Sequence, residues 1–165
     1  MKKSAVVCHD MNGKLYKVSP AKLSFRPSVY GVIIKNKKIL LFKQTDGNYD
    51  FPGGGIEIDE TIDEALKREV WEETGFKIKK GKLLDCFTSF FYARYRKKFF
   101  NTVLVYYECG ITGGKLTKKN LEKWEKEYGF GPVWVDLSDF KKSNLIFRNG
   151  VDSIGLVKKV INLKK

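Results

Sequence analysis

The chain has 165 residues and a formal net charge of +13, and 42% of its residues are hydrophobic and 14% aromatic. This length fits one globular domain with a sizeable core, and the composition excludes an intrinsically disordered chain. No apolar run approaches the roughly 18 to 20 residues of a transmembrane helix, and the first apolar run is too short for a secretory signal. We therefore expect a soluble, cytoplasmic protein with no membrane contact.

The excess of positive charge would attract polyanions such as nucleotides and nucleic acids. Most of it is lysine, and only five residues are arginine, the side chain that specific phosphate recognition favours. Lysines scattered over turns therefore indicate a solvated surface as readily as a nucleic-acid surface. The basic run Arg94-Tyr95-Arg96-Lys97-Lys98 is interpreted either as a solvated hairpin tip or as a clamp for phosphate or RNA.

Hydrophobic patterning predicts strands on both sides of a central helix, followed by a second helix near the last residues. Asn12-Gly13 indicates a hairpin of two short strands within residues 4–18. Further strands are predicted at 29–34, 39–44, near 76–90, at 99–109 and at 133–135, and helices at 62–74 and about 151–163. This order predicts an α/β fold in which a mixed β-sheet packs between helices. Residues 1–25 would form a β-ribbon extension and residues 26–165 a single domain.

The central helix has clear boundaries, because Thr61 and Glu64 form a capping box and Gly75 provides a stop. On a helical wheel, Ile62, Ala65 and Leu66 share one sector that should face the sheet. The same sector continues into three acidic residues. They are Glu69, Glu72 and Glu73. The stripe predicted to face the core therefore changes from apolar to acidic halfway along the helix.

Three carboxylates at this spacing repel one another and lie at the unfavourable end of the helix dipole. Arg68 can compensate one of them, and a hard divalent cation such as Mg²⁺ or Mn²⁺ can compensate the rest. A solvated acidic face is the alternative. The preceding segment favours the metal site, because Pro52-Gly53-Gly54-Gly55 is predicted to be a loop whose backbone can approach a ligand closely, and Glu57 and Glu60 add two more acids.

This pattern resembles the Nudix box, G-x5-E-x7-R-E-U-x-E-E-x-G-U, where U is a bulky apolar residue. Gly54 is followed by five residues and Glu60, and then by seven residues and Arg68-Glu69-Val70-Trp71-Glu72-Glu73-Thr74-Gly75-Phe76. Every fixed position matches across residues 54–76, so the resemblance is very specific. It implies a Nudix-type α/β/α sandwich and a pyrophosphohydrolase that depends on Mg²⁺, with Mn²⁺ as a substitute.

The resemblance also implies roles for individual residues. Glu69, Glu72 and Glu73 would bind the metal together with the backbone carbonyl of Gly53. Gly53, Gly54 and Glu57 would form the cofactor-binding site, in which the glycines leave room for the pyrophosphate and Glu57 is another acid linked to the metal. Arg68 would orient a box glutamate, and Glu60 would brace the loop.

The general base would be a box glutamate or a glutamate from a later loop, where Glu122, Glu125 and Glu127 are candidates. Glu127 is preferred because Gly129 and Gly131 after it allow a mobile lid. Base recognition would use one or two of several aromatic residues, most of which belong to the core. The candidates are Tyr49, Phe51, Phe87, Phe90, Phe91 and Tyr92.

Three functions remain open for such a chain. The preferred one is hydrolysis of a nucleoside triphosphate, ordinary or modified, to a nucleoside monophosphate and pyrophosphate. The second is removal of pyrophosphate from an RNA 5′ end, which the net charge favours. The third is a ligand-binding domain without catalysis, which the complete set of box acids disfavours. The protein would be a monomer or a homodimer.

Overall fold

A computed structural model describes residues 3–10, 13–44, 47–121, 126–127, 129–142 and 151–163. Before the glycine segment the strands are β1 (Val6–His9), β2 (Leu15–Val18), β3 (Leu23–Phe25), β4 (Ser28–Lys35), β5 (Lys38–Gln44) and β6 (Tyr49–Asp50). They are followed by β7 (Gly53–Gly55), α1 (Ile62–Thr74), β8 (Phe76–Ala93), β9 (Lys98–Gly114), β10 (Gly129–Asp136), α3 (Leu137–Lys142) and α4 (Ser153–Leu163). Two short 3-10 turns are η1 (Pro20–Lys22) and η2 (Arg94–Arg96).

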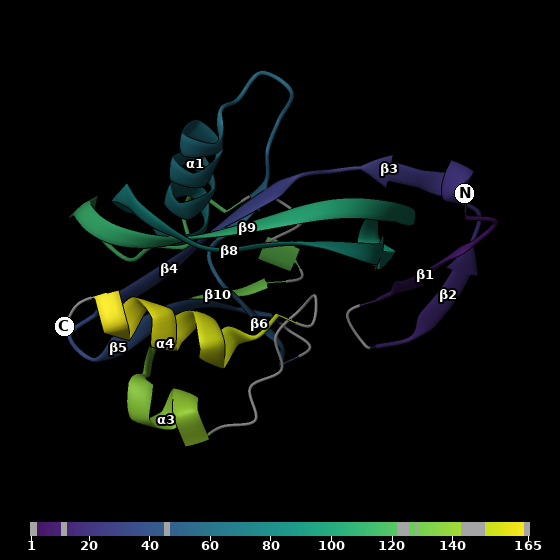
Figure 1. Ribbon diagram of the computed structural model, residues 1–165. Coiled ribbons are helices and arrows are strands. Elements are labelled where there is room, and N and C mark those ends of the chain that lie inside the picture. The colour runs from purple at the N-terminus through teal and green to yellow at the C-terminus, as the bar shows by residue number, and fades with distance from the viewer. Residues whose placement is uncertain are drawn as a thin grey trace.

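The strands form one mixed sheet in the order β10-β5-β4-β9-β8-β1-β2, with β3, β6 and β7 paired to β9, β5 and β4. The pair β4–β9 is parallel, whereas β8–β9 and β5–β10 are antiparallel. Helix α1 lies on one side of the curled sheet, and α3 and α4 lie on the other (Figure 1). The predicted α/β/α sandwich with a mixed sheet is confirmed.

Each face of the sheet has its own hydrophobic core. Ala65, Leu66 and Val70 of α1 pack on alternate residues of β4, beginning with Val29. On the other face, Leu156, Val157 and Val160 of α4 pack with Phe140 of α3 and with Val32. Because successive residues of β4 point into the two opposite cores, the strand is buried on both faces, as its continuous apolar run predicts.

Helix α1 begins and ends where its sequence predicts. The Thr61 hydroxyl accepts from the Glu64 backbone N–H, the Glu64 carboxylate accepts from the Thr61 backbone N–H, and Gly75 is left-handed with φ +79°. The predicted buried stripe needs one correction. Ile62 is 38% exposed, whereas Val70, outside the predicted stripe, is fully buried. The helix is therefore rotated toward the Val70 side relative to the wheel.

Four elements differ clearly from those that the sequence predicts. The glycines predicted to form a loop are instead strand β7, in which Gly53, Gly54 and Gly55 pair with Tyr30, Val29 and Ser28. Strands β8 and β9 extend several residues beyond their predicted ends because they pair with each other almost throughout. Helix α3 was not predicted, since its six residues are too short to show helical periodicity.

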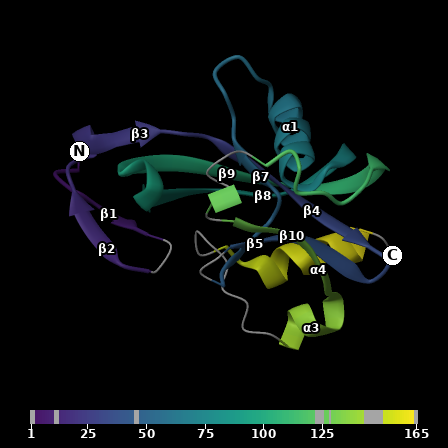
Figure 2. The same cartoon turned by 180° about the vertical axis from the view of Figure 1, so that it is seen from behind.

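The predicted N-terminal ribbon is present as β1 and β2, which pair from Val6–Val18 to His9–Leu15. The ribbon and β3 lie beside the far end of the β8–β9 hairpin, and together they project away from α1 and α4 (Figures 1 and 2). The division of the chain at residue 25 stays a prediction. No helix in the described part of the chain is long and apolar enough to cross a membrane.

Candidate active site on the acidic face of α1

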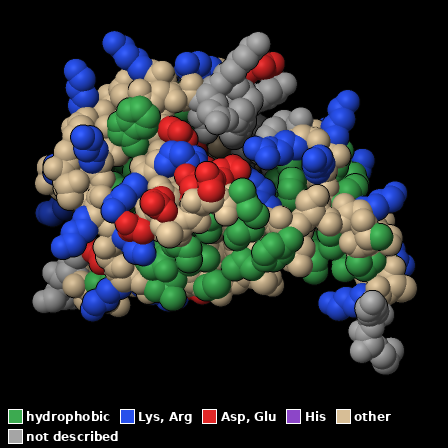
Figure 3. Space-filling model, turned by 90° about the horizontal axis from the view of Figure 1, so that it is seen from above, with side chains coloured by type: hydrophobic (Ala, Val, Ile, Leu, Met, Phe, Trp, Pro, Cys, Tyr) green, Lys and Arg blue, Asp and Glu red, His purple; other side chains and the backbone are tan. Residues whose placement is uncertain are grey.

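The second half of α1 brings its acidic residues to the sheet rather than to open solvent. Glu73 is only 7% exposed, and the Glu69 and Glu72 side chains are 13% and 25% exposed. Acidic side chains gather over the region of α1 when the molecule is seen from above (Figure 3). Carboxylates this buried need partners that neutralise them, and the structure shows which partners they have.

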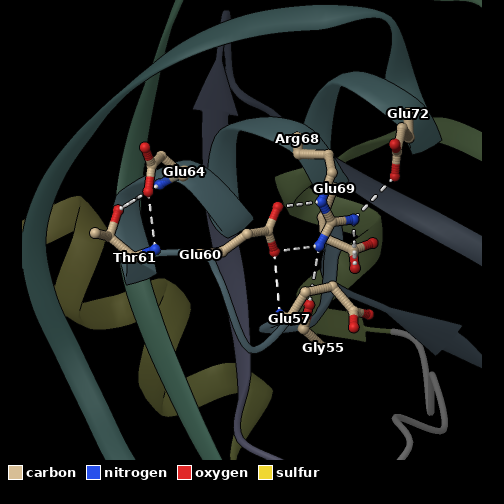
Figure 4. Close-up of polar contacts among 8 residues, drawn as sticks. All are labelled: Gly55, Glu57, Glu60, Thr61, Glu64, Arg68, Glu69 and Glu72. Carbon is tan, nitrogen blue, oxygen red and sulfur yellow. Dashed lines mark hydrogen bonds and ion pairs between the residues drawn. The ribbon is translucent and has the colours of Figure 1, made fainter.

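Arg68 lies at the centre of these carboxylates (Figure 4). Its Nε and Nη2 donate to the two oxygens of Glu60 at 2.5 and 2.8 Å. Its Nη1 lies 3.0 Å from Glu69 Oε1 and 3.1 Å from Glu72 Oε2, and Nη2 also donates to the Gly55 carbonyl at 3.1 Å. One guanidinium thus joins three carboxylates to the glycine strand.

The electrostatics follow from this geometry. Hydrogen bonding to Glu60, followed by the Coulombic attraction of Glu69, raises the pKa of Arg68. The same hydrogen bonds lower the pKa of Glu60. Glu60 also accepts the Glu57 backbone N–H at 3.1 Å, so it fixes the loop that leads into α1, as predicted for a bracing residue.

The glycines of β7 are required by close approaches to the acidic face. The Gly53 N–H donates to Glu73 Oε2 at 2.8 Å, and Gly53 has φ +147°, a region that favours glycine. A Cβ atom on Gly54 would lie 2.6 Å from the Glu69 carboxylate. Strand β7 and α1 are therefore packed so closely that only glycine, which has no Cβ atom, leaves room for the carboxylates.

The donor set fits a hard divalent cation in its chemistry, because it consists of carboxylate oxygens close to backbone carbonyls. Arg68 Nη1 lies between Glu69 and Glu72, where these two carboxylates present oxygens to a common point. Within the described residues, no three acidic, histidine or cysteine side chains already form a metal-binding group. A cation held by these glutamates would therefore require their carboxylates to turn from Arg68.

Arg26, which no sequence motif marked, lies on the other side of the same glycine strand. A Cβ atom on Gly55 would lie 2.7 Å from Arg26 Nε, so the guanidinium packs directly on the glycine backbone. In the part of the chain that the structure describes, no carboxylate pairs with Arg26, in contrast to Arg68. The only sequence signal is its position just before Pro27 and β4, and this signal is weak.

The other acidic residues predicted for the site lie in the loop before α1 and in the segment before β10. Glu57 is exposed at the start of the loop before α1. Glu127 is exposed two residues before β10 and forms no hydrogen bond or ion pair with a box residue among those described. The β10 end that follows it pairs with Gln44 and Lys43, at the end of β5 that leads toward β7. Glu122 and Glu125 lie outside the described residues.

Most of the aromatic candidates for base recognition are core or ribbon contacts. Phe51 is fully buried, and both Phe51 and Phe87 pack on Tyr106, at ring-centroid distances of 5.9 and 5.7 Å. Phe91 contacts His9 and Tyr92 contacts Tyr16, both on the ribbon. Tyr49 and Phe90 are half-buried, and Tyr49 packs at the margin of the α4-side core.

Comparison with known proteins identifies the family. A family model described as the NUDIX domain matches residues 24–151. The chain belongs to the NUDIX domain family. Nudix hydrolases are pyrophosphohydrolases that act on nucleotide substrates and generally use a divalent metal.

Individual relatives support this membership. An 8-oxo-dGTP diphosphatase of Buchnera aphidicola subsp. Schizaphis graminum is 36% identical over 121 residues, which cover 70% of this chain and 81% of that protein. A MutT-like protein of Streptomyces ambofaciens is 30% identical over 106 residues, covering 61% of this chain and 64% of its own length, just under two thirds.

The fold is also that of solved Nudix structures. A NUDIX hydrolase from Nitrosomonas europaea superposes with a TM-score of 0.63 at 18% sequence identity, covering 86% of this chain and 92% of that one. At this identity the likeness concerns the fold alone.

Proposed function

We propose that this Nudix hydrolase cleaves a nucleoside triphosphate, ordinary or oxidised, into a nucleoside monophosphate and pyrophosphate. The observation that carries the proposal is the group of carboxylates around Arg68 beside a strand of three glycines. Such a surface combines concentrated negative charge with backbone carbonyls close by, which suits a cation-bridged pyrophosphate better than a neutral ligand.

In this proposal, Glu69, Glu72 and Glu73 hold Mg²⁺ or Mn²⁺ together with the carbonyl of Gly53. Bound there, the metal would neutralise charge on the anhydride oxygens and lower the pKa of a bound water. Arg68 keeps Glu69 and Glu72 close together, and Glu60 in turn fixes the plane of the guanidinium through two hydrogen bonds. Gly54 leaves the Glu69 carboxylate room to turn, because a Cβ atom there would meet it.

We assign to Arg26 a contact with a substrate phosphate. The half-buried guanidinium of Arg26 has no carboxylate partner in the described chain, so no ion pair there neutralises its positive charge. It lies directly on Gly55 at the edge of the acidic face. The backbone of Arg26 is held in place, since Thr102 Oγ1 donates to the Arg26 carbonyl at 2.6 Å. Replacing Arg26 with alanine is expected to raise KM at least tenfold and to change kcat much less.

Glu127 is proposed as the base that takes the proton from the attacking water. The water oxygen bonds to phosphorus, the bridging P–O bond breaks, and pyrophosphate leaves with the electron pair of that bond. The position of Glu127 just before the β10 end that pairs with Lys43 and Gln44 supports the assignment. Glu127→Gln should lower kcat by a hundredfold or more and leave Mg²⁺ affinity unchanged, whereas a box glutamate acting as base would leave Glu127→Gln nearly fully active.

The test is turnover of nucleoside triphosphates, 8-oxo-dGTP, sugar nucleotides, dinucleoside polyphosphates and ADP-ribose in Mg²⁺, with products separated by chromatography. We expect one of the triphosphates to yield monophosphate and pyrophosphate, and Glu72→Gln to reduce its turnover by orders of magnitude. Asp59→Asn is the matched control, because Asp59 is an exposed acid in the loop before α1 and is not one of the fixed positions of the box. Folded protein that turns over no nucleotide in Mg²⁺ or Mn²⁺ would refute the proposal.

A further inference from the structure

A second charged surface lies away from the acidic face. We call it the ribbon lobe, and it consists of residues 3–25 with the far end of the β8–β9 hairpin, residues 87–101. These segments hold eight lysine and arginine residues and a single acidic residue, Asp10, within a chain of net charge +13. More than half of the net charge of the protein is therefore concentrated at one end.

The single acid does not reduce the charge of the lobe surface, because it is used inside the lobe. Asp10 is 3% exposed. Its two oxygens accept from the Lys14 backbone N–H and from the Tyr16 hydroxyl, both at 3.0 Å. Arg94 Nε of the hairpin tip lies 3.9 Å from the same carboxylate. Asp10 thus joins the ribbon to the hairpin tip and is not available to compete for other cations.

The basic side chains, in contrast, are exposed on both parts of the lobe. They include Lys14, Lys17 and Lys22 on the ribbon side and Arg94, Lys97 and Lys98 at the hairpin tip. Basic and hydrophobic side chains share the lobe in the view from above, while the acidic side chains gather over α1 (Figure 3). The acidic side chains of the site therefore lie away from the ribbon lobe.

Aromatic rings lie among these cations. Tyr92 stacks on Phe99 with ring centroids 4.5 Å apart, and Tyr16 packs against Tyr92 at 4.8 Å. The Lys14 ammonium lies 5.4 Å from the centre of the Tyr16 ring. On β3, Phe25 is 67% exposed, although burying a phenyl ring would be favourable. Rings interleaved with cations are what single-stranded nucleic acids contact, through bases and phosphates respectively.

We propose that the ribbon lobe binds single-stranded RNA, with the lysines contacting phosphates and Phe25 stacking on a base. This inference goes beyond the proposed function, because the surface lies outside the acidic face and binding needs neither metal nor catalysis. Single-stranded RNA fits better than a duplex, whose stacked bases cannot reach an exposed ring.

The experiment measures fluorescence anisotropy of a 3′-labelled, 20-nucleotide single-stranded RNA titrated with the full chain in EDTA, so that hydrolysis is excluded. The test variant replaces Lys17, Lys22 and Lys98 with alanine. The matched control replaces Lys77, Lys79 and Lys82, which are exposed on the opposite end of β8. Both variants lose three charges, so they differ only in where the charge is lost.

We expect the lobe variant to bind the RNA at least tenfold more weakly and the control to change affinity less than twofold. The slope of log Kd against log salt should fall by about 2 in the lobe variant, since each phosphate contact contributes about 0.7. A lobe variant with arginine in place of the three lysines should retain affinity. Equal losses in lobe and control variants, or no loss in either, would overturn the proposal.

The stacking contact is tested separately with two side chains of equal exposure. Phe25 and Leu15 are both 67% exposed on the lobe. Phe25→Ala should weaken single-stranded RNA binding at least fivefold, and Leu15→Ala less than twofold. Equal effects would contradict base stacking. Tighter binding to duplex RNA, or to phosphatidylserine vesicles at the same ionic strength, would overturn single-stranded RNA as the partner.

Discussion

Arg68 shows how one residue makes an otherwise unfavourable acidic cluster stable. Three partly buried carboxylates would repel one another, and the guanidinium contacts Glu60, Glu69 and Glu72 at the same time. Removing one partner from a buried ion pair costs more than forming the pair contributes, because the remaining charges stay desolvated. The cluster therefore depends on Arg68 far more than a surface ion pair depends on either partner.

We expect Arg68→Ala to lower the free energy of unfolding by about 2 kcal/mol or more in EDTA. Lys67→Ala is the control, because Lys67 contacts Asp63 in an exposed pair on the same helix; it should cost about 0.5 kcal/mol or less. Urea denaturation measures both. Equal losses would show that the buried cluster contributes no more than a surface pair.

Gly53 is required both for its backbone conformation and for the space around it, whereas Gly47 is required only for its backbone conformation. Gly53 and Gly47 both have positive φ, so alanine is strained at either position. A Cβ atom on Gly47 would meet nothing within 4 Å, whereas one on Gly53 would lie 2.6 Å from Tyr30 Cα. Gly47→Ala should cost about 1 kcal/mol and Gly53→Ala at least 2 kcal/mol more, measured by thermal unfolding. Equal costs would mean that β7 can move away from β4.

For individual residues, the sequence predicts the acidic residues of the site and their spacing but not all the side chains that contact them. Arg68 was expected to compensate one glutamate, and the structure shows it contacting three carboxylates. Helical periodicity relates residues within α1, whereas the contact to Glu60 depends on how the preceding loop folds. Arg26 was missed for the same reason, since only the pairing of β4 with β7 brings it to Gly55.

Among the elements, α4 is attached to the sheet by the side chain of Lys159 as well as by its core side chains. The Lys159 ammonium donates to the Leu84 carbonyl and to Asp85 Oδ2 on β8, both at 2.8 Å. This hydrogen bond lowers the pKa of Asp85. The pair stabilises the folded state above the unfolded pKa of Asp85, near 3.9, and its contribution is lost as the pH falls through the lower folded pKa.

We therefore expect stability to fall between pH 5 and pH 3 by a larger amount in the native chain than in Asp85→Asn. The comparison uses urea unfolding at several pH values in this range. Asp59→Asn serves as a control, because Asp59 is exposed at a distance from α4, and it should reproduce the native curve. Parallel curves for the native chain and Asp85→Asn would contradict the predicted linkage.

The elements that the sequence predicts well are those with a local signal. Thr61, Glu64 and Gly75 mark both ends of α1, and these residues form the predicted caps. The lengths of β8 and β9 depend on their mutual pairing, which no local pattern encodes. Strand β7 was missed because glycine has low strand propensity, and its place is determined by β4 and by the acids behind it.

For the whole molecule, the distribution of charge predicts how metal and stability are linked. A chain with net charge +13 repels divalent cations from most of its surface, so added Mg²⁺ should act mainly at the acidic face. A ligand that binds only the folded state stabilises it by about 2.7 kcal/mol when the ligand concentration is a hundred times its dissociation constant. The thermal midpoint should therefore rise with Mg²⁺ and reach a plateau.

Glu72→Gln should reduce this Mg²⁺-dependent rise, and NaCl at matched ionic strength should not reproduce it in the native chain. Differential scanning fluorimetry measures each case. Because crowding of like charges is relieved, Glu72→Gln should be at least as stable as the native chain in EDTA. An equal rise in the variant and the native chain would place the stabilising metal elsewhere.

Strand β2 ends the strand order of the sheet, and this position has a consequence for self-association. An outermost strand offers unpaired backbone groups on which another molecule can add a strand and begin an aggregate. β2 is only four residues long and carries Lys17 in its centre, with Lys14 just before it. A short, charged border of this kind is a poor template for fibril growth, so the lysines of the ribbon also keep copies of the chain apart at high concentration.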